Sequence, residues 1–414
     1  MKKKIAFVIQ LYGLEVNGGA EYHCRMIAEK LQDIYDVEVL TSCAKDHITW
    51  ANTYPDGPGE VNGIKVRRFN TDHPRQRREL RKISKKINKA TTLHKIARSL
   101  GLLNAYERFL SPKVTDKDYE NWVRYQGPYL PKLITYLKEN EANYDALIFF
   151  TYLYYPAIYG IDIAPQKSIL VPTAHDEPQI YYPIFQRLFH TPKAILYNTL
   201  SEKRFVNRLF NNDGIYSAIA GVGIDAVKPA ITPGIKDILK TDSPYIIYIG
   251  RIDAFKGCQL LIDHFLKYRD DNKADMKLVL VGKAFMQLPA DEDIIHTGFV
   301  DENVKIALLQ NAKALIMPSF YESLSLVTLE SMAYGVPVIA NQNCEVLKDH
   351  IENSHAGFLF NSYDSFKIAV DTISAPGFDS TKLSRNAKKY VAENYSWAAV
   401  IEKYHDAINY VSRH

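Results

Sequence analysis

Two glutamates that stand eight positions apart, Glu322 and Glu330, are the residues of this chain best suited to hold a polyhydroxylated ligand. The sequence predicts a buried strand over 314–319, a turn over 321–323 and a helix from Leu326 onward. Glu322 would then lie in the loop before the helix, and Glu330 in its second turn. Because a carboxylate accepts two hydrogen bonds side by side, each glutamate suits the vicinal hydroxyls of a ribose or a hexose.

The short loop between the two glutamates predicts an anion site. The backbone amides of Ser323, Leu324 and Ser325 would lie at the N-terminus of the helix. Unpaired N–H groups and the helix dipole favour a phosphate or a sugar hydroxyl at such a position. Glutamates on either side of this loop could hold a sugar at each end of a diphosphate.

Two cations follow an earlier predicted strand in YIIYIGRIDAFKG. Gly250 ends the strand, and Arg251 and Lys256 come next, near the carboxyl edge of the sheet. A diphosphate needs donors spread over several oxygens, and a forked guanidinium with a compact ammonium provides them. The alternative is one surface salt bridge for each cation. We favour a diphosphate site, because two cations beside a glycine at a strand's ligand-binding end form a constrained arrangement.

A glycine pair ends the first strand region, in LYGLEVNGGAEYHC. Gly18 and Gly19 precede a predicted helix, where glycine allows close approach of a ligand and the helix N-terminus favours an anion. A plain tight turn is the alternative. The pattern is not the G-x-G-x-x-G dinucleotide fingerprint, so a nicotinamide cofactor loses support.

A histidine follows the strand SILVPTA. His175 would lie at the same kind of sheet edge as the cations, where it could hydrogen-bond a ligand or shuttle a proton. A histidine without a functional role is the alternative, since the feature stands alone.

No metal or cofactor is expected. Asp291, Glu292 and Asp293 precede a strand instead of following one, so we expect a solvated loop there. The cysteines are scattered without CxxC spacing, which argues against both a disulfide framework and a zinc site and favours a reducing cytoplasm. They are Cys24, Cys43, Cys258 and Cys344.

The elements that position these residues belong to an α/β fold. Nearly continuous apolar runs alternate with helical patterns, which is typical of parallel strands covered on both faces. With 414 residues, 47% of them apolar, two domains are expected, and the glycine and prolines of 223–233 mark a linker. We predict two doubly wound domains over 1–224 and 225–395, with a cleft at the carboxyl ends of their strands, and an amphipathic helix within 396–414. The expected strands are IAFVIQ, VEVLTS, IKVRRF, ALIFF, SILVPTA, AILYNT, YSAIAGVG, YIIYIGR, KLVLVG, IIHTGFV, ALIMPS, PVIAN and AGFLF.

The N-terminus, MKKKIAFVIQLYG, is expected to be the first buried strand, because Gln10 breaks the apolar run and no cleavage site follows. No apolar stretch approaches the roughly 20 residues that span a bilayer. Any membrane contact would therefore be peripheral.

A basic insertion at about 74–136 interrupts the α/β alternation. Its apolar residues recur at spacings of three and four, and basic residues over 75–89 lie between them, which predicts a basic amphipathic helix. Two interpretations stay open: a solvated helix on the first domain, or a surface for anionic phospholipid or a lipid-linked, phosphate-bearing acceptor. Nucleic acid has less support, because no aromatic platform or known motif accompanies the charge. The apolar positions are Leu80, Ile83, Ile87, Ala90, Leu93 and Ala97.

Taken together, these motifs resemble the retaining glycosyltransferases of the GT-B fold, specifically family GT4, or glycosyltransferase group 1. The resemblance rests on PSFYESLSLVTLESMAYGVPVIA, GRIDAFKG, NGGAE and GVGID, in the expected order over nearly the whole chain. The chain departs from the commoner motif in having Ser323 and Ser325 where glycines are frequent. Serine is also small, and it favours the N-cap of a helix. The longer basic insertion leaves the acceptor side least defined.

The resemblance implies roles for the residues of the second domain. Arg251 and Lys256 would bind the donor diphosphate, and Glu330 would bind the nucleotide ribose. Glu322 would contact the transferred sugar. Phe299–Val300, in the loop after IIHTG, would contact the base through backbone groups.

Two residues of the first domain also match the family. Gly19 would approach the distal phosphate of the donor, and His175 would lie near the donor sugar. His175 thus joins Glu322, Arg251 and Lys256 in the expected catalytic set. The final helix would cross back to the first domain.

The implied reaction is metal-independent transfer of a hexosyl group from a UDP- or GDP-sugar to a hydroxyl of a glycan or lipid-linked acceptor. The family's usual mechanism is front-face transfer, in which a donor phosphate oxygen takes the acceptor proton. Bacterial surface polysaccharide assembly by a cytoplasmic enzyme, peripheral to the inner face of the cell membrane, fits the basic helix. The alternatives are a sugar-nucleotide epimerase of similar architecture and a non-catalytic sugar-binding protein.

Overall fold

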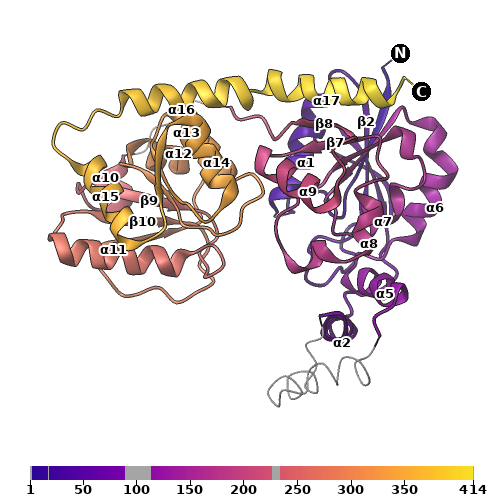
Figure 1. Ribbon diagram of the computed structural model, residues 1–414, viewed down its shortest axis with the longest axis horizontal. Coiled ribbons are helices and arrows are strands. Elements are labelled where there is room, and N and C mark those ends of the chain that lie inside the picture. Colours follow the sequence, from indigo (N-terminus) through magenta and orange to yellow (C-terminus); the bar gives the residue numbers. More distant parts are fainter. Residues whose placement is uncertain (1, 17, 89–112, 226–233, 414) are drawn as a thin grey trace. The chain divides into compact units, whose positions relative to one another are not determined.

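The computed structural model describes residues 2–16, 18–88, 113–225 and 234–413. Within these ranges the chain forms two compact units, each built on its own sheet (Figure 1). Unit 1 comprises residues 1–197, 203–219 and 401–414, and unit 2 comprises residues 198–202 and 220–400. Part of the expected linker, residues 226–233, lies outside the described residues.

Unit 1 is built on an eight-stranded sheet with the order β3-β4-β2-β1-β5-β6-β7-β8. All neighbouring pairs are parallel except β3 and β4. The central strands β5, β6 and β7 are buried along their whole length, as their continuous apolar sequences predict. The strands are β1 (Lys4–Val8), β2 (Asp36–Ser42), β3 (Gly57–Val61), β4 (Ile64–Phe69), β5 (Ala146–Phe150), β6 (Ser168–Val171), β7 (Ala194–Tyr197) and β8 (Tyr216–Ile219).

Among the described residues, β3 is the one strand that the sequence analysis missed. Its sequence, GPGEV, has no apolar run, and its three central residues are exposed at the sheet edge. It pairs antiparallel with β4 through a two-residue turn at Asn62 and Gly63, which have φ values of 51° and 79°. An Asn-Gly pair with two positive φ angles is the type I′ hairpin turn, so this dipeptide was the available signal for the strand.

Helices flank the sheet of unit 1 and bury its apolar faces. The core includes Phe149, Leu170 and Ile195 from the strands, with Leu133 and Leu137 from a covering helix. The helices are α1 (Gly19–Leu31), α2 (Arg77–Ile87), α5 (Asp116–Gln126), α6 (Pro131–Asn140), α7 (Tyr155–Gly160), α8 (Ile184–Leu188) and α9 (Leu200–Phe210), with the 3-10 turns η1 (Glu141–Asn143), η2 (Pro165–Lys167) and η3 (Pro178–Tyr181).

The basic insertion contains the expected amphipathic helix over α2, which lies beside α5 (Figure 1). Leu80, Ile83 and Ile87 turn toward the core of unit 1 and are partly buried there. Lys86 Nζ lies 2.8 Å from Asp118 Oδ2, and Trp122 Nε1 donates to Ser84 Oγ at 3.1 Å, which fixes α2 on α5. The expected continuation of the helix through Ala90, Leu93 and Ala97, with Lys89, lies outside the described residues.

Unit 2 is built on a six-stranded, wholly parallel sheet with the order β11-β10-β9-β12-β13-β14. Its strands match the six predicted apolar runs. They are β9 (Tyr245–Ile249), β10 (Lys277–Val281), β11 (Ile294–Gly298), β12 (Leu315–Met317), β13 (Val338–Asn341) and β14 (Gly357–Phe360).

Helices cover both faces of this second sheet: Figure 1 shows α11 on the side opposite α12 and α13. α11 packs against α15 on one face, and α13 packs against α12 and α16 on the other. The helices are α10 (Ile235–Leu239), α11 (Cys258–Asn272), α12 (Glu302–Asn311), α13 (Leu326–Tyr334), α14 (Glu345–Ser354), α15 (Tyr363–Ser374) and α16 (Thr381–Asn394).

The last helix, α17 (Trp397–Val411), contributes to both units. Its residues up to Val400 belong to unit 2, and those from Ile401 belong to unit 1. In unit 1, His405 Nδ1 lies 2.7 Å from the Tyr35 hydroxyl, and the Tyr410 ring stacks on Tyr216 at 4.4 Å.

A search of the described ranges for membrane-spanning helices finds none with both the length and the apolar character that crossing a bilayer requires.

Candidate donor-binding site

The predicted strand, turn and helix around the two glutamates are confirmed. β12 ends at Met317 and α13 begins at Leu326, so Glu322 lies in the connecting loop and Glu330 in the second turn of the helix. Both carboxylates line one cavity of about 280 Å³ in unit 2. The predicted residues that share this cavity are Gly250, Arg251, Lys256, Glu322, Ser325 and Glu330.

The first glutamate forms an ion pair inside the cavity. Lys256 Nζ lies 2.7 Å from Glu322 Oε1, and the Glu322 side chain is only 11% exposed. The Lys256 backbone amide donates to Asp253 Oδ1 at 2.9 Å, which orders the turn that carries the lysine. The Lys256 ammonium and the Glu322 carboxylate neutralise each other in this pair. If a charged sugar ligand separated them, the ammonium could bind one part of the ligand and the carboxylate another.

The guanidinium of Arg251 also has a carboxylate partner. Its Nε donates to Asp253, although the Arg251 side chain is 56% exposed. Burial opposes ionisation of Asp253, but the Lys256 amide and the Arg251 guanidinium outweigh it and hold the Asp253 pKa below its usual value. One carboxylate therefore orders both predicted phosphate-binding cations.

Gly250 allows the backbone conformation with which the chain leaves strand β9. Its φ is +150°, and a Cβ there would lie 3.0 Å from the Tyr248 hydroxyl. That hydroxyl donates to the Arg251 carbonyl at 2.8 Å, so the buried tyrosine supports the backbone at which Arg251 leaves the sheet. A side chain at position 250 would strain both the backbone and this contact.

The second glutamate is paired with a lysine that the sequence analysis missed. Lys305 Nζ lies 3.0 Å from Glu330 Oε2 and 2.8 Å from Glu302 Oε1. Burial raises the pKa of Glu330, and Lys305 opposes that rise without cancelling it. Lys305 stands in the first turns of α12, directly after β11, so its place near a strand's carboxyl end was a usable clue.

The loop between the glutamates ends at Ser325, which is the N-cap residue of α13. Ser325 precedes α13 with φ 60° and ψ 68°, and its hydroxyl pairs with the Thr328 hydroxyl at 2.8 Å instead of capping a backbone amide. Ser325 is thus the N-cap residue of α13 by position, as the small serine allowed, but its hydroxyl makes no capping bond to a backbone amide. Its left-handed conformation costs an L-residue about 1 kcal/mol, which explains why glycine suits the position.

Several predicted donor contacts do not line this cavity. Phe299 is 90% exposed, and it lies with Val300 between β11 and α12. The side chain of Leu324 is buried, and Ser323 is half-buried in the loop. The structure therefore groups the cations, both glutamates and Ser325, but leaves these four residues outside the cavity.

The two predicted glycines belong to unit 1, at the start of α1. The helix begins at Gly19, and Gly18 precedes it with an extended backbone. A Cβ on Gly19 would meet nothing within 4 Å, whereas one on Gly18 would lie 2.0 Å from Glu21 Oε2. Gly19 is thus open to a ligand, whereas a side chain at Gly18 would displace the Glu21 carboxylate.

His175, also in unit 1, lies four residues beyond the end of β6. Its Nε2 is 3.7 Å from Glu177 Oε2, and the Glu177 carboxylate accepts a hydrogen bond from the Tyr152 hydroxyl. His175 Nδ1 is buried without a hydrogen-bond partner in the described structure. A histidine that is oriented on one side by a carboxylate is suited to present its ring to a ligand.

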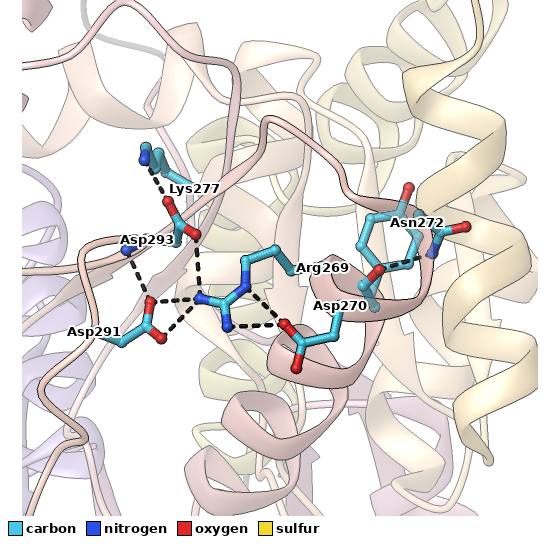
Figure 2. A network of polar contacts seen from close by, with 7 residues as sticks. Arg269, Asp270, Asn272, Lys277, Asp291 and Asp293 are labelled. Carbon is cyan, nitrogen blue, oxygen red and sulfur yellow. Dashed lines mark hydrogen bonds and ion pairs between the residues drawn. The ribbon is translucent and has the colours of Figure 1, made fainter.

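The acidic segment before β11 is not the solvated loop that the sequence predicted. Arg269 Nη1 lies 2.7 Å from Asp291 Oδ1 and 3.1 Å from Asp293 Oδ2, and Lys277 also pairs with Asp293 (Figure 2). The Asp291 and Asp293 side chains are only 20% and 18% exposed. The segment is an ion-pair network because α11 and β10 each supply a cation. In the described ranges, no three His, Cys, Asp or Glu side chains are grouped as metal ligands.

The chain has the GT-B fold, because it consists of two units that are each built on a largely parallel sheet. One of these units carries sugar-suited carboxylates and phosphate-suited cations at its strand ends. Residues 235–390 match the family model of glycosyl transferases group 1, so the chain carries a domain of that family, as the resemblance implied. This segment contains the whole cavity.

Comparisons with known proteins agree with this assignment. The chain is 31% identical over 171 residues to an uncharacterized glycosyltransferase, MJ1607, of Methanocaldococcus jannaschii, covering 38% of this chain and 43% of that protein. It is 25% identical over 252 residues to a D-inositol 3-phosphate glycosyltransferase of an Arthrobacter strain, covering 55% and 59%. The chain thus spans less than two thirds of these relatives. The solved structure of Anabaena Alr3699/HepE in complex with UDP has a TM-score of 0.68 at 14% identity and covers 99% of this chain and 100% of that one.

Proposed function

We propose that this protein is a retaining glycosyltransferase of family GT4 that transfers a hexosyl group from a UDP- or GDP-sugar to a hydroxyl of a glycan or lipid-linked acceptor. The observation that carries the proposal is the single cavity in unit 2 that gathers two phosphate-suited cations and two sugar-suited carboxylates. Among the two nucleotides, UDP has the added support of a similar fold solved in complex with UDP.

In this proposal Arg251 and Lys256 bind the diphosphate and stabilise its negative charge as the glycosidic bond breaks. Lys256 exchanges its 2.7 Å contact with Glu322 for a phosphate oxygen, which frees Glu322 for the hydroxyls of the transferred sugar. Glu330 binds the ribose hydroxyls from the helix. Catalysis is then chiefly charge stabilisation and alignment, with fixed side-chain cations in the role that a metal ion plays elsewhere.

The acceptor proton passes to a donor phosphate oxygen on the same face from which the diphosphate departs. The bond between the anomeric carbon and the phosphate oxygen breaks, and the bond to the acceptor oxygen forms with the anomeric configuration retained. No covalent sugar on Glu322 is required. Gly19 and His175 of unit 1 are proposed to contact the distal phosphate and the donor sugar.

We further propose that the enzyme works in the cytoplasm, at the inner face of the cell membrane, in bacterial surface polysaccharide assembly. Five exposed cations of α2 line one surface depression, and only one of them has an acidic partner among the described residues, Lys82 with Glu79 at 3.0 Å. Such a surface attracts anionic lipid head groups or a lipid-linked diphosphate. The five are Arg77, Arg78, Arg81, Lys82 and Lys85.

The proposal is tested with purified protein and a panel of UDP- and GDP-hexoses, first by thermal shift and then by product analysis. A selective donor should raise the unfolding temperature by mass action. Adding a glycan or lipid-linked acceptor should then give a glycoside whose anomeric configuration matches the donor. A new epimer formed without any acceptor would instead identify an epimerase, and no stabilisation or turnover with any donor would refute the transferase.

A further inference from the structure

His350 on α14 makes two hydrogen bonds, and one of them reaches the loop of the candidate site. The side chain is 1% exposed, its Nε2 lies 2.8 Å from the Leu324 carbonyl oxygen, and its Nδ1 lies 3.0 Å from the Tyr390 hydroxyl. Tyr390 comes from α16, and the rings of Tyr390 and Tyr395 both pack edge-on against the imidazole. The imidazole thus connects α16 with the loop that carries Glu322.

The protonation state of this histidine follows from its partners. A carbonyl oxygen only accepts, so Nε2 must carry a proton and donate to Leu324. Burial lowers the pKa of His350 to about 4, so the ring is neutral near pH 7 and Nδ1 has no proton. Nδ1 therefore accepts from the Tyr390 hydroxyl, and the tyrosine selects the tautomer that donates to the loop.

The hydrogen bond to the Leu324 carbonyl fixes the orientation of the whole Leu324–Ser325 peptide group. The Leu324–Ser325 peptide is trans, so its C=O and its N–H point in opposite directions. With the carbonyl directed toward buried His350, the Ser325 amide is directed to the other side, and Ser325 lines the cavity. Ser325 also holds φ 60°, an unfavourable angle for serine, and such a conformation persists where the surrounding structure supports it.

We propose that His350 is a positioning residue that, through the Leu324 carbonyl, aims the Ser325 amide at the donor diphosphate. This inference rests on the proposed function, because the diphosphate is the ligand that the amide would meet. Tyr390 supports it by holding the imidazole in the donating tautomer. His350 itself does not contact the ligand.

The test compares two substitutions that each keep half of the imidazole's hydrogen bonding. In His350→Gln the side-chain amide reaches the position of Nε2, so the donor to Leu324 is retained. In His350→Asn the amide reaches only the position of Nδ1, so the contact with Leu324 is lost. Calorimetry with UDP and GDP should give wild-type affinity within about twofold for His350→Gln and about tenfold weaker binding for His350→Asn. Binding of uridine or guanosine, which lack phosphates, should be equal in both variants.

Equal diphosphate affinities in folded His350→Gln and His350→Asn would overturn the positioning role, because a packing role alone does not distinguish them in this way. A measurement on the unmodified protein tests the same inference even if a variant does not fold. The ¹⁵N NMR shifts of His350 should show protonated Nε2 and unprotonated Nδ1 at neutral pH, and the opposite tautomer would overturn the inference. If the wild type bound neither UDP nor GDP while its His350 had the expected tautomer, the proposed function would be the part that failed.

Discussion

Lys256 and Glu322 form an ion pair of 2.7 Å, although their side chains are suited to opposite parts of the same ligand. The ammonium suits a diphosphate, and the carboxylate suits the hydroxyls of a hexose. The pair keeps both groups ordered and satisfied in a site where the glutamate is almost fully buried. A donor that brings a diphosphate and a sugar together satisfies each group separately, whereas either fragment alone leaves one of them unpaired.

Replacing Lys256 by Ala should therefore lower both turnover and stability. The diphosphate loses a charge-stabilising donor, which we expect to lower kcat by about 10² to 10³. Glu322 also loses its partner, so the free energy of unfolding should fall. Initial rates of nucleotide release and urea unfolding measure the two effects. Lys389→Ala, at an exposed position on α16, is the matched control, and a rate near wild type for Lys256→Ala would contradict the diphosphate assignment.

Replacing Arg251 by Ala should lower turnover but leave the fold intact. Its side chain is 56% exposed, and an ion pair at such a position adds little stability. We expect a loss of about 10² in kcat with an unchanged unfolding midpoint. Arg251→Lys should recover only part of the rate, because an ammonium lacks the guanidinium fork. If both variants turned over like the wild type, Arg251 would have no role in binding the diphosphate.

The sequence identified most of the fold and the centre of the site because both follow from parallel-strand geometry. Continuous apolar runs marked every strand except β3, and residues after strands β9 and β12 had to meet at one sheet edge. What it missed depends on contacts between distant elements. Lys305 and Glu330 are 25 positions apart in the sequence, and His350 and Leu324 are 26 apart. The periodicity of apolar residues in each helix does not predict which residues of two such helices or loops come into contact. The acidic segment at Asp291 was misjudged for the same reason, since its cation comes from α11.

The Lys305–Glu330 pair predicts a pH dependence of nucleotide binding. The ionised Glu330 carboxylate accepts ribose hydrogen bonds more strongly than the protonated acid, and burial raises its pKa above the usual value. Nucleotide affinity should therefore rise with pH through this raised pKa and then level off. Lys305→Met removes the cation that opposes the rise, so the midpoint should move to higher pH. Calorimetry with UDP from pH 5 to 8 measures the shift.

Glu330→Gln provides the control for this titration. It removes the ionisable group, so binding should be about tenfold weaker and its pH dependence flatter than in the wild type. A Lys305→Met profile that coincides with that of the wild type would show that the lysine does not act on Glu330.

The α2 surface predicts binding to anionic vesicles. Arg78, Arg81 and Lys85 are exposed, and each basic residue near such a membrane contributes about 1 kcal/mol. Replacing all three by Ala should weaken binding to phosphatidylserine vesicles about hundredfold, and added salt should weaken wild-type binding in the same direction. The triple variant of Lys382, Arg385 and Lys389 on α16 removes equal charge elsewhere. Equal losses in the two triple variants would show that net charge alone governs binding, and would remove α2 as the membrane-contacting surface.

The buried imidazole of His350 predicts a loss of stability in acid that one substitution should remove. Its pKa is lowered from about 6.5 in the unfolded chain to about 4 in the fold, because burial disfavours the charged ring. Above pH 6.5 neither state binds this proton, so the group adds no pH dependence there. As the pH falls toward 4, the unfolded chain takes up the proton and the folded protein does not, so the free energy of unfolding falls by up to about 3 kcal/mol.

His350→Gln does not titrate and keeps the hydrogen bond to Leu324, so it isolates this component of the acid sensitivity. Urea unfolding at intervals from pH 7 to pH 4 should show a smaller decline for the variant than for the wild type. All other groups titrate in both proteins, so the difference between the two curves reports His350 alone. The difference should be flat above pH 6.5 and should grow in favour of the variant toward pH 4, over the interval that separates the unfolded and folded pKa values. Parallel curves throughout would mean that His350 takes up its proton in the folded protein as readily as in the unfolded chain. Burial would then not keep the imidazole in the neutral tautomer that donates to Leu324.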